Sequence, residues 1–346
     1  MILPKLTDIG FKDKTVLVRS DLDVPLKNGR VEDDTRIKEC LPTIKYLLDQ
    51  GAKVILLGHL DRPGGKIVDE FRMLIVAEEI NKKLNIKNQI YREKIKNFEA
   101  YRLTPNLTLL ENLRFYAGEE NNNIEFARNL SSLGDFYVND AFATSHREHA
   151  SIVGLPKFLS HFAGLHFIDE VEGLSKAIEN PKRPLVYLLG GKKLETKLPY
   201  IESFSRRADI VLVGGKLIQS PKIKNQNGEF GDKIIWAKLT ESGLDISEEF
   251  IKEFSKIINE AGTIVWNGPM GKFEDKKSEM GTRKIAEAIA KSLAFKIIGG
   301  GDTIAALRKF NLFDKMDYVS TAGGAMLEFL AKGTLPGIEA LMKRND

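Results

Sequence analysis

Cationic side chains follow several short apolar segments in the first half of the chain. They are Arg36, His59, Arg62, Arg114 and Arg147, and Arg19 stands at the end of the first of these segments. Any one of these residues, taken alone, is best explained as a solvated or surface-paired side chain. Guanidinium groups that gather at one place are instead suited to bidentate contacts with phosphate and carboxylate groups. The pattern therefore predicts a pocket for a small polyanion, provided that the fold brings these side chains to one edge of a sheet.

Glycines take the corresponding positions in the second half of the chain. They occur as Gly190-Gly191, Gly214-Gly215, Gly268 with Gly271, Gly299-Gly300-Gly301 and Gly323-Gly324. A glycine between a strand and a helix lets backbone N–H groups approach a phosphate, and the helix N-terminus adds a partial positive charge. One such turn also fits an ordinary tight connection, but five at the same edge of a sheet predict phosphate binding.

Asp302, in the segment from Gly299 to Thr303, is open to two interpretations. It is either the N-cap of a helix or a ligand of a magnesium ion beside bound phosphates. The neighbouring glycines favour the magnesium ion. His146 and His149 could begin a second metal site, but no third ligand has matching spacing, so hydrogen-bonding or structural roles are favoured for both.

Two common nucleotide-binding motifs are missing from the sequence. There is no G-x-x-x-x-G-K-[ST] loop, which disfavours P-loop ATPases, and no G-x-G-x-x-G after the first strand, which disfavours dinucleotide-dependent dehydrogenases. The residues alone support a two-domain enzyme that holds a small acidic phosphorylated metabolite on one domain and a magnesium nucleotide on the other. Phosphoryl transfer across the cleft is the reaction that this arrangement predicts.

An alternation of short apolar runs and amphipathic segments must position these residues. The runs are rich in Val, Ile and Leu, and the segments between them have helical period, which is typical of a parallel sheet covered by helices on both faces. We predict strands at Thr15–Arg19, Lys53–Leu57, Leu107–Leu110, Phe136–Asn139, Leu185–Leu189, Asp209–Val213, Thr263–Trp266, Phe295–Ile298 and Tyr318–Ser320. In open α/β sheets, ligands bind beyond the carboxyl ends of the strands, which is where the cations and the glycines stand.

Two predicted helices matter for the site. The first follows the pair Asp33-Asp34, which caps its N-terminus, and it ends near Gly51, so that Arg36 lies in its first turn. The second extends from residue 167 to residue 180 and ends at the segment NPKRP. Because this helix separates the cation-rich half from the glycine-rich half, we place the domain boundary there.

Length and composition limit the class of protein. At about 150 residues per domain, the 346 residues predict two domains. Hydrophobic residues make up 42% and charged residues 29%, which is ordinary for a globular protein, and no apolar run approaches the roughly 20 residues of a membrane span. The net charge of +4 is not concentrated in a basic tail, which disfavours nucleic acid as a partner. Cys40 is the only cysteine, and the N-terminus lacks a signal peptide's apolar core, so we expect a cytoplasmic protein without disulfides.

At these residues the chain closely resembles the phosphoglycerate kinase family. The resemblance rests on residues 33–63 (DDTRIKECLPTIKYLLDQGAKVILLGHLDRP), 109–120 (LLENLRFYAGEE), 137–156 (YVNDAFATSHREHASIVGLP), 179–193 (ENPKRPLVYLLGGKK), 263–274 (TIVWNGPMGKFE) and 297–307 (IIGGGDTIAAL). It implies two doubly wound parallel-sheet domains joined by a long helix, with a cleft between them. Residues 1–160 would bind phosphoglycerate, 161–184 would form the connecting helix and linker, 185–329 would bind the nucleotide, and the tail from about 330 to 346 would pack back on the first domain. The implied enzyme is a monomeric phosphotransferase of glycolysis and gluconeogenesis, which moves the acyl phosphate of 1,3-bisphosphoglycerate reversibly to MgADP and so gives 3-phosphoglycerate and ATP.

The resemblance also implies roles for individual residues of this sequence. The phosphoglycerate pocket would consist of Asp21, Asp23, Arg36, His59, Arg62, Arg114 and Arg147, with Arg36 facing the migrating phosphoryl group. On the nucleotide side, Lys193 and Lys197 would contact the phosphates, Asp302 the magnesium ion, Thr303 the α-phosphate and Glu274 the ribose, with Asn267, Gly300 and Gly301 near the phosphates. Gly323 and Gly324 would donate amides to the group in flight, and they would form the catalytic set together with Arg36 and Lys193.

The sequence departs from the family pattern at four places. Asp23 stands where the family usually has Asn, Asp61 and Ala322 stand where it usually has Gly, and the span from Gly214 to about Asp245 is much shorter than usual. Asp23 adds a negative charge to an anion pocket, Ala322 could crowd the amide cradle, and the short span removes much of the apolar wall for adenine. A non-catalytic metabolite- or nucleotide-binding descendant and a different small-molecule kinase on a similar frame are the alternatives. Enzyme activity is favoured by retention of Arg36, Lys193, Lys197 and Asp302.

Overall fold

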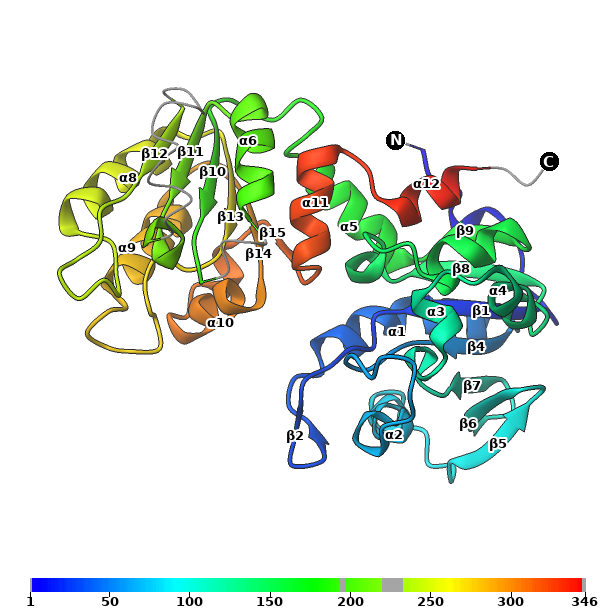
Figure 1. Cartoon of the computed structure of the whole chain (residues 1–346). Helices are drawn as coiled ribbons and strands as arrows, with labels where there is room; N and C mark the ends of the chain where they lie inside the picture. The colour runs from blue at the N-terminus through cyan, green and yellow to red at the C-terminus, as the bar shows by residue number, and fades with distance from the viewer. Residues whose placement is uncertain (1, 193–196, 220–232, 344–346) are drawn as a thin grey trace. The chain divides into compact units, whose positions relative to one another are not determined.

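The computed structural model describes residues 2–192, 197–219 and 233–343. The chain divides into two compact units (Figure 1). Unit 1 consists of the residues up to Glu170 together with those from Leu335 onward, and unit 2 consists of Val171–Thr334. Each unit has one large sheet with helices on both of its faces, so the predicted α/β class is confirmed.

Unit 1 is built on a seven-stranded sheet in the order β5-β6-β7-β4-β1-β8-β9. Its strands are β1 (Thr15–Ser20), β4 (Lys53–Leu57), β5 (Tyr91–Ile95), β6 (Phe98–Thr104), β7 (Leu107–Leu110), β8 (Phe136–Asp140) and β9 (Ser160–Ala163). The strands from β7 to β9 in this order are parallel, whereas β5 and β6 form an antiparallel edge. A separate hairpin of β2 (Leu26–Lys27) and β3 (Arg30–Val31) follows β1.

The predicted strands of unit 1 are those in the middle of the sheet. Every residue of β7 is buried, and so is every residue but the first of β1, β4 and β8, as expected of parallel strands covered on both faces. The antiparallel edge escaped prediction because β5 reads YREKI, which contains no apolar run and is largely exposed. The parallel sheet that we predicted for the first half therefore carries an antiparallel extension.

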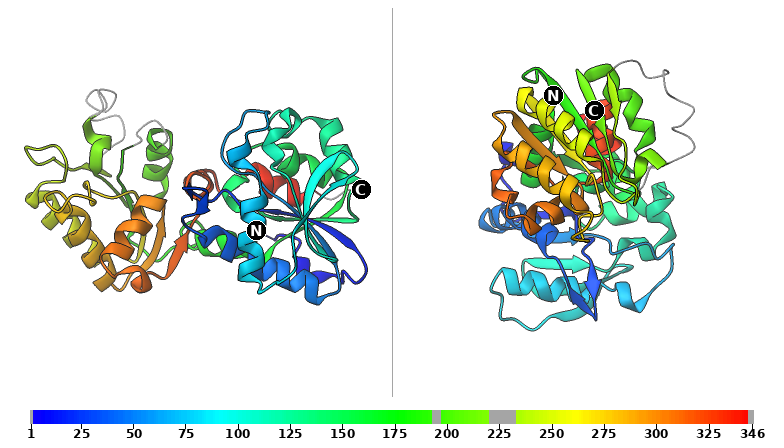
Figure 2. Two further views of the ribbon diagram at one scale, coloured as in Figure 1. Left: turned by 90° about the horizontal axis from the view of Figure 1, so that it is seen from below. Right: turned by 90° about the vertical axis from the view of Figure 1, so that its left-hand side faces the viewer.

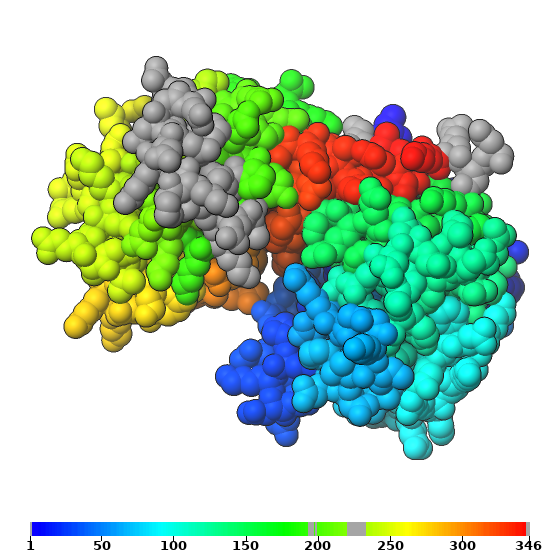
Figure 3. All heavy atoms as spheres, viewed as in Figure 1, coloured from blue at the N-terminus to red at the C-terminus, as the bar shows by residue number. Residues whose placement is uncertain are grey.

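Helices cover both faces of this sheet (Figures 1 and 2). On one face lie α1 (Thr35–Asp49) and α2 (Leu74–Lys83), and Ile37 and Ile44 of α1 share a core with Val16 and Leu56 of the strands. The remaining elements of unit 1 are η1 (Leu6–Asp8), η2 (Asp69–Phe71), η3 (Leu113–Phe115), α3 (Ala117–Glu120), α4 (Ile124–Ser131), η4 (Phe142–Thr144), η5 (Ala150–Gly154), η6 (Leu155–Lys157) and α12 (Pro336–Met342). Of these, α4 and α12 pack on η5 and η6, and in Figure 3 the red C-terminal segment lies against the green surface of unit 1.

Unit 2 is built on a six-stranded, fully parallel sheet in the order β12-β11-β10-β13-β14-β15. Its strands are β10 (Leu185–Leu189), β11 (Ile210–Val213), β12 (Ile234–Trp236), β13 (Thr263–Asn267), β14 (Phe295–Gly299) and β15 (Tyr318–Ser320). Five of the six were predicted to within one residue at each end, because each is a short apolar run. The short edge strand β12 was not predicted.

The helices of unit 2 also lie on both faces of the sheet. They are α6 (Leu198–Arg207), η7 (Gly215–Gln219), α8 (Glu248–Glu260), α9 (Met280–Lys291), α10 (Gly301–Lys309), η8 (Phe313–Lys315) and α11 (Gly324–Lys332). One core joins α8, α9 and α10 to Trp266 and neighbouring strand residues, and on the opposite face Phe204 of α6 stacks on Tyr187 of β10 with ring centroids 4.5 Å apart. Within the ranges described here, no helix is both long and apolar enough to cross a membrane.

Each sheet reverses its strand order at one point. In unit 1 the chain moves from β1 outward to β4 and β7 and then returns to β8 on the other side of β1. In unit 2 it moves from β10 to β11 and β12 and then returns to β13 on the other side of β10. Such a switch point leaves a crevice beyond the strand ends, which is where open α/β sheets bind ligands. The two candidate sites are therefore expected beyond β1 and β8 and beyond β10 and β13.

Helix α5 (Leu165–Ser175) crosses the boundary between the units, which falls between Glu170 and Val171. It starts two residues before the predicted helix and ends five residues before the predicted end. Its first turn belongs to unit 1 because the Leu165 amide donates to Thr43 Oγ1 at 2.9 Å and the Phe167 amide donates to Asp140 Oδ1 at 3.1 Å. The division therefore lies inside α5 and within residues 161–184, which the resemblance assigns to the connecting helix and linker.

Candidate active site

Four arginines and a histidine converge at the switch point of unit 1. Arg19 ends β1, Arg36 lies in the first turn of α1, His59 follows β4, Arg114 lies in η3 and Arg147 follows η4. Their proximity is evident from the pKa shifts. Besides burial, the pKa of His59 is lowered by the charges of Arg19, Arg114 and Arg36. Besides burial, the pKa of Arg114 is lowered by the charge of Arg147, among others. We call these five residues the cationic cluster. The sequence predicted that all five share one edge of a sheet, but it did not assign Arg19 to the anion pocket.

Burial determines which members of the cluster carry charge. Burial, followed by the neighbouring arginines, lowers the pKa of His59 well below its usual range and that of the nearby His149 to about 3. Burial also lowers the pKa of Arg114 to about 10, which still leaves this guanidinium charged at neutral pH. His59 and His149 are therefore neutral and Arg114 is positive, and the neighbouring guanidinium groups of Arg19 and Arg147 repel the charge of Arg114. An anion bound among them would relieve this repulsion.

The loops that follow β1 and β4 are tied together by backbone and carboxylate groups. The Asp61 amide donates to Asp23 Oδ1 at 2.8 Å, Arg36 NH1 donates to the Asp23 carbonyl oxygen at 2.8 Å, and Arg114 NH1 donates to the Asp61 carbonyl oxygen at 2.8 Å. Asp23 Oδ2 lies 3.7 Å from Arg36 NH1 and 3.7 Å from His59 Nε2. The carboxylate of Asp23 therefore already faces two of the groups that we expect to bind an anion.

Asp21 and Arg62 differ from the rest of the predicted pocket. Asp21 is buried, and its two carboxylate oxygens accept from the Ala143 amide at 2.8 Å and from the Thr144 hydroxyl at 2.9 Å, so that it holds the loop after β8. Arg62 is exposed, and its amide donates to Asp61 Oδ1 at 2.8 Å. A direct contact of either side chain with a substrate stays a prediction.

Arg19 was not selected from the sequence as a site residue. It is fully buried at the end of β1, where NH2 lies 2.9 Å from His59 Nδ1. The signal that could have found it is an arginine inside the otherwise apolar run TVLVRS, because a charged residue is rarely buried without a partner.

The glycine loops of unit 2 come together at its switch point. The Gly191 amide donates to the Pro269 carbonyl oxygen at 2.8 Å, which joins the loops after β10 and β13. A Cβ atom at Gly190 would collide with the Pro269 carbonyl oxygen, and one at Gly268, which has a φ of +98°, would collide with the Gly190 carbonyl oxygen. These glycines are required by the packing of one loop on the other.

Three other glycines have no such packing requirement. At Gly301, Gly323 and Gly324 no described heavy atom lies within 4 Å of the position that a Cβ atom would take. Gly323 has a φ of +57°, which favours glycine, whereas Gly301 and Gly324 do not have a positive φ. Gly301 and Gly324 begin α10 and α11, so their amides are among those that lack a partner within the helix. Their missing side chains leave room for a ligand to approach the backbone.

A buried lysine lies beneath the loops after β10 and β13. Lys197 Nζ donates to the Gly190 carbonyl oxygen at 2.5 Å and to the Asn267 carbonyl oxygen at 2.9 Å, and burial lowers its pKa to about 8. An ammonium group has three donors, and two of them have acceptors among the described residues, so we expect the third to bind a phosphate oxygen. Thr303, fully buried in α10, accepts from the Gly268 amide at 2.7 Å through Oγ1. The predicted residues Lys197, Asn267 and Thr303 thus meet at one point.

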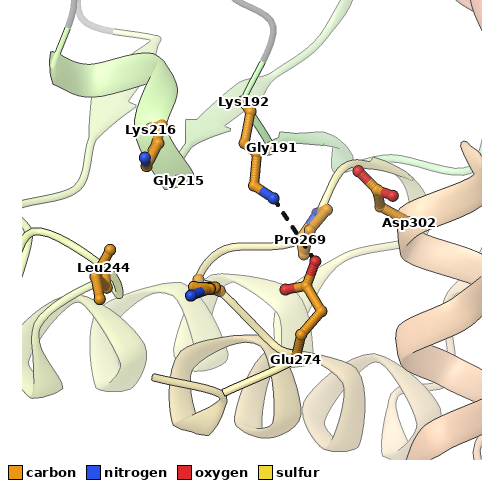
Figure 4. A pocket seen from close by; sticks show the side chains of 10 residues that line it. Gly191, Lys192, Gly215, Lys216, Leu244, Pro269, Glu274 and Asp302 are labelled. Atoms are coloured by element: carbon orange, nitrogen blue, oxygen red, sulfur yellow. Dashed lines mark ion pairs between the residues drawn. The ribbon is translucent and has the colours of Figure 1, made fainter. Parts of the chain in front are cut away.

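A pocket opens beside these loops (Figure 4). It is lined by Gly191, Lys192, Gly215, Lys216, Leu244, Pro269, Gly271, Lys272, Glu274 and Asp302. Glu274 pairs with Lys192 at 3.7 Å, and the carboxylate of Asp302 projects from the first turn of α10 toward the loops. Lys193, which we predicted to contact the phosphates, lies outside the described residues.

Comparisons with known proteins agree with this geometry. The sequence model of the family described as "Phosphoglycerate kinase" matches residues 6–242 and 232–333. The phosphoglycerate kinase of Dictyoglomus turgidum is 41% identical over 394 aligned positions, which cover 98% of each chain. The solved structure of phosphoglycerate kinase from Coxiella burnetii is similar with a TM-score of 0.85 at 36% identity and covers 100% of both chains. That from Pyrococcus horikoshii has a TM-score of 0.81 at 32% identity, with 98% of both chains covered.

The chain belongs to the phosphoglycerate kinase family. It is accordingly a kinase, a transferase of glycolysis, and the comparisons give no support to the non-catalytic alternative. The predicted two-domain fold is confirmed by the family's solved structures. The alignment with the phosphoglycerate kinase of Coxiella burnetii extends over 388 positions and that with the Dictyoglomus turgidum enzyme over 394. Both numbers exceed the 346 residues of this chain, so these two relatives contain segments that this chain lacks.

Two of the departures from the phosphoglycerate kinase pattern have a structural explanation. Asp61 has a φ of +55°, a conformation that favours glycine and that Asp adopts more easily than most other residues. Ala322 is buried and does not have a positive φ, so its backbone is ordinary for a residue with a side chain. Within the shortened span, η7 and β12 are described, whereas residues 220–232 lie outside the described residues.

Proposed function

We propose that this member of the family transfers the acyl phosphate of 1,3-bisphosphoglycerate to MgADP and, in reverse, the γ-phosphate of ATP to 3-phosphoglycerate. The cationic cluster of unit 1 binds the phosphoglycerate, and the glycine loops of unit 2 bind the nucleotide. The observation that carries the proposal is the gathering of guanidinium groups at the switch point of unit 1, where burial, and then Arg19 and Arg147, lower the pKa of Arg114. A small compound with carboxylate and phosphate groups would stabilise such a cluster.

On unit 1, we assign the reacting end of the site to Arg36. Its side chain is 29% exposed, whereas Arg19 and Arg114 are nearly inaccessible. Arg36 therefore faces the migrating phosphoryl group, while Arg114, Arg147 and His59 hold the rest of the phosphoglycerate. The exposed side chain of Arg62 also contacts the phosphoglycerate once the ligand is bound.

On unit 2, backbone amides take the place of side-chain cations. The amides of Gly323 and Gly324 donate to the phosphoryl group while it is transferred. The amides of Gly300 and Gly301 donate to the nucleotide phosphates, as do the side chains of Lys193 and Lys197. Asn267 supports these contacts through its carbonyl oxygen, which holds Lys197. The Thr303 hydroxyl, held by the Gly268 amide, donates to the α-phosphate, and Glu274 binds the ribose.

Asp302 fits the role of a magnesium ligand. Its carboxylate is exposed at the start of α10 and lies on the pocket beside Gly191 and Glu274. Magnesium is usually held by one or two carboxylates, with phosphate oxygens and water as its other ligands. When bound, the ion neutralises charge that develops on the phosphates. Asp302 would therefore hold the metal ion through its carboxylate beside the bound nucleotide.

The reaction requires little covalent chemistry from the protein. The attacking oxygen, a phosphate oxygen of ADP or the carboxylate of 3-phosphoglycerate, is already ionised, so no general base is needed. The residues align the attacking and leaving oxygens and stabilise the charge between them. Because the two ligands bind to different units, transfer requires the units to close by hinge bending and to exclude water. Both sets of groups come from one chain, so the proposed transfer needs no second subunit, and we propose a monomer that works in the cytoplasm.

A coupled assay tests the proposed function. Purified protein is supplied with 3-phosphoglycerate and MgATP, and the formation of 1,3-bisphosphoglycerate is followed through its reduction by an added dehydrogenase. We expect saturable turnover that requires both substrates and the metal ion. Binding of both ligands without turnover would instead support the non-catalytic alternative. Small-angle scattering with neither, one and both ligands tests closure, and a radius of gyration that is unchanged with both would contradict it.

A further inference from the structure

A chain of buried polar groups leads from α3 to the cationic cluster. Glu119 is fully buried, and its carboxylate accepts from the Ser151 hydroxyl at 2.6 Å and from the Ser151 amide at 2.9 Å. Ser151 Oγ in turn accepts from Arg19 Nε at 2.9 Å. The chain therefore connects a buried carboxylate to a buried guanidinium through one hydroxyl group.

Arg19 is held at three points. Besides the bond to Ser151, NH1 donates to the Ser20 carbonyl oxygen at 2.6 Å, and NH2 lies 2.9 Å from His59 Nδ1. A guanidinium group has only donors and stays protonated in proteins, so it cannot accept a hydrogen bond from the ring. His59 Nδ1 must therefore present its lone pair to Arg19, and the ring proton of the neutral imidazole must be on Nε2.

His59 Nε2 faces the ligand side of the cluster. It lies 3.7 Å from Asp23 Oδ2, next to Arg36, whereas Nδ1 faces the interior of the unit. The charged and titratable groups around the ring are Arg19 on β1, Arg36 on α1, Arg114 in η3, His149 beyond η4, and Asp23 after β1. Burial and the three arginines lower the pKa of His59 well below its usual range, which keeps the ring neutral.

We propose that Arg19 is a positioning residue that fixes the ring proton of His59 on Nε2, so that this histidine presents a single N–H donor to the ligand. Ser151 and Glu119 hold Arg19 in the orientation that this requires. In the other tautomer Nε2 would present a lone pair to an anionic ligand, which would repel it. The identity of that ligand as phosphoglycerate rests on the function proposed above, whereas the position of the proton does not.

The direct test is the ring nitrogen spectrum of His59 in the full-length protein labelled with ¹⁵N. The chain has five histidines, and the signals of His59 are identified as those lost in His59→Gln. We expect Nδ1 to have the shift of an unprotonated nitrogen and Nε2 that of a protonated one at neutral pH. A protonated Nδ1, or two protonated nitrogens, in the wild-type protein would overturn the proposal. This measurement requires neither substitution of Arg19 nor any ligand.

Two substitutions then separate positioning from structure. Arg19→Gln replaces an obligate donor by an amide that can also accept, so we expect a mixture of His59 tautomers and a KM for 3-phosphoglycerate that rises about tenfold, with the KM for ATP unchanged. Ser151→Ala removes only the hydroxyl that orients Arg19, and we expect the same changes to a smaller extent. The ring signals of His161, on β9, serve as the internal control for the fold.

The outcomes distinguish this proposal from the proposed function. If the wild-type tautomer is as expected but 3-phosphoglycerate does not bind, the assignment of the ligand is wrong and the positioning role of Arg19 stands. If binding is normal and both variants keep the Nε2–H tautomer, Arg19 does not set the position of the proton and the inference is wrong. A folded variant with the expected shift of tautomer and a weakened affinity supports both.

Discussion

The two candidate sites occupy the same topological position but bind anions by different means. In unit 1 the switch point is lined by arginine side chains, two of which are almost completely buried. In unit 2 it is lined by glycines, whose contribution is the backbone amide, and by the buried ammonium group of Lys197. A doubly wound sheet therefore supplies the crevice, whereas the residues after each strand decide whether charge or backbone geometry binds the ligand.

This difference determines which kind of substitution weakens ligand binding at each site. A site made of side chains fails when a group is removed, because each guanidinium contributes its own charge and donors. A site made of backbone amides fails when a group is added, because a new side chain occupies the space of the ligand. The predictions below test the contrast by removing groups from unit 1 and adding them to unit 2.

The largest effect is expected from Arg36→Ala in unit 1. Loss of a donor that acts on transition-state charge lowers kcat on the order of 100-fold or more, and we expect the KM for 3-phosphoglycerate to change far less. Arg128→Ala is the matched control, because Arg128 is an exposed arginine of α4 in the same unit. Steady-state kinetics of both variants decide the matter. A normal kcat with a raised KM would restrict Arg36 to ground-state binding.

The second-largest effect on activity is expected from the addition of a methyl group in unit 2. Gly324→Ala places Cβ where no described heavy atom lies within 4 Å, at the first residue of α11. We expect the melting temperature to stay the same or rise, since Ala is favoured over Gly in a helix, while kcat falls about tenfold or more. Gly10→Ala is the control, because Gly10 in unit 1 also has open space and does not have a positive φ. Full activity of Gly324→Ala would mean that the ligand does not approach this amide.

Alkaline pH should distinguish the two sites without any substitution. The pKa of Lys197 is lowered by burial to about 8, so its ammonium group is charged below that pH and loses its proton as the pH rises through it. A guanidinium group stays protonated over this range, and even Arg114, whose pKa burial lowers to about 10, keeps its charge. Between pH 7 and pH 9 we expect kcat/KM for ATP to fall several-fold more than kcat/KM for 3-phosphoglycerate. Parallel profiles for the two substrates would show that Lys197 does not bind the nucleotide as an ammonium group.

The smallest effect is expected from Asp23→Asn in unit 1. The amide oxygen can still accept from the Asp61 amide, while the negative charge near Arg36 and His59 is lost. A like charge close to a partly solvated ligand costs on the order of 1 kcal/mol, so we expect 3-phosphoglycerate to bind about fivefold more tightly with an unchanged kcat. Calorimetric titration gives the affinity. Asp23→Ala, which also removes the acceptor of the Asp61 amide, should lose that gain, and a severe loss of activity in Asp23→Asn would show that the carboxylate is required.

The sequence predicted the elements that are buried on both faces and the residue types at their ends. It did not predict β5 and β9, because strands at an edge need no apolar run. Arg19, at the end of the first predicted strand, was not assigned to the anion pocket, because its contact with His59 depends on how two strands meet. Hydrogen bonds between distant residues, such as that from the Thr144 hydroxyl to Asp21, depend on how two loops meet and leave no local pattern. The sequence could therefore locate both sites, but it could not tell which of their polar groups hold the protein together.

The central claim is that unit 1 binds the phosphoglycerate through arginines and unit 2 binds the nucleotide through backbone amides. Amide and arginine side-chain ¹⁵N spectra, recorded with 3-phosphoglycerate alone and with MgADP alone, test it most directly. We predict that 3-phosphoglycerate shifts the guanidinium signals of Arg36 and Arg114, and that MgADP shifts the amide signals of Gly300 and Gly301. Glycine amides of unit 2 that respond to 3-phosphoglycerate while the arginine signals stay unchanged would contradict the account.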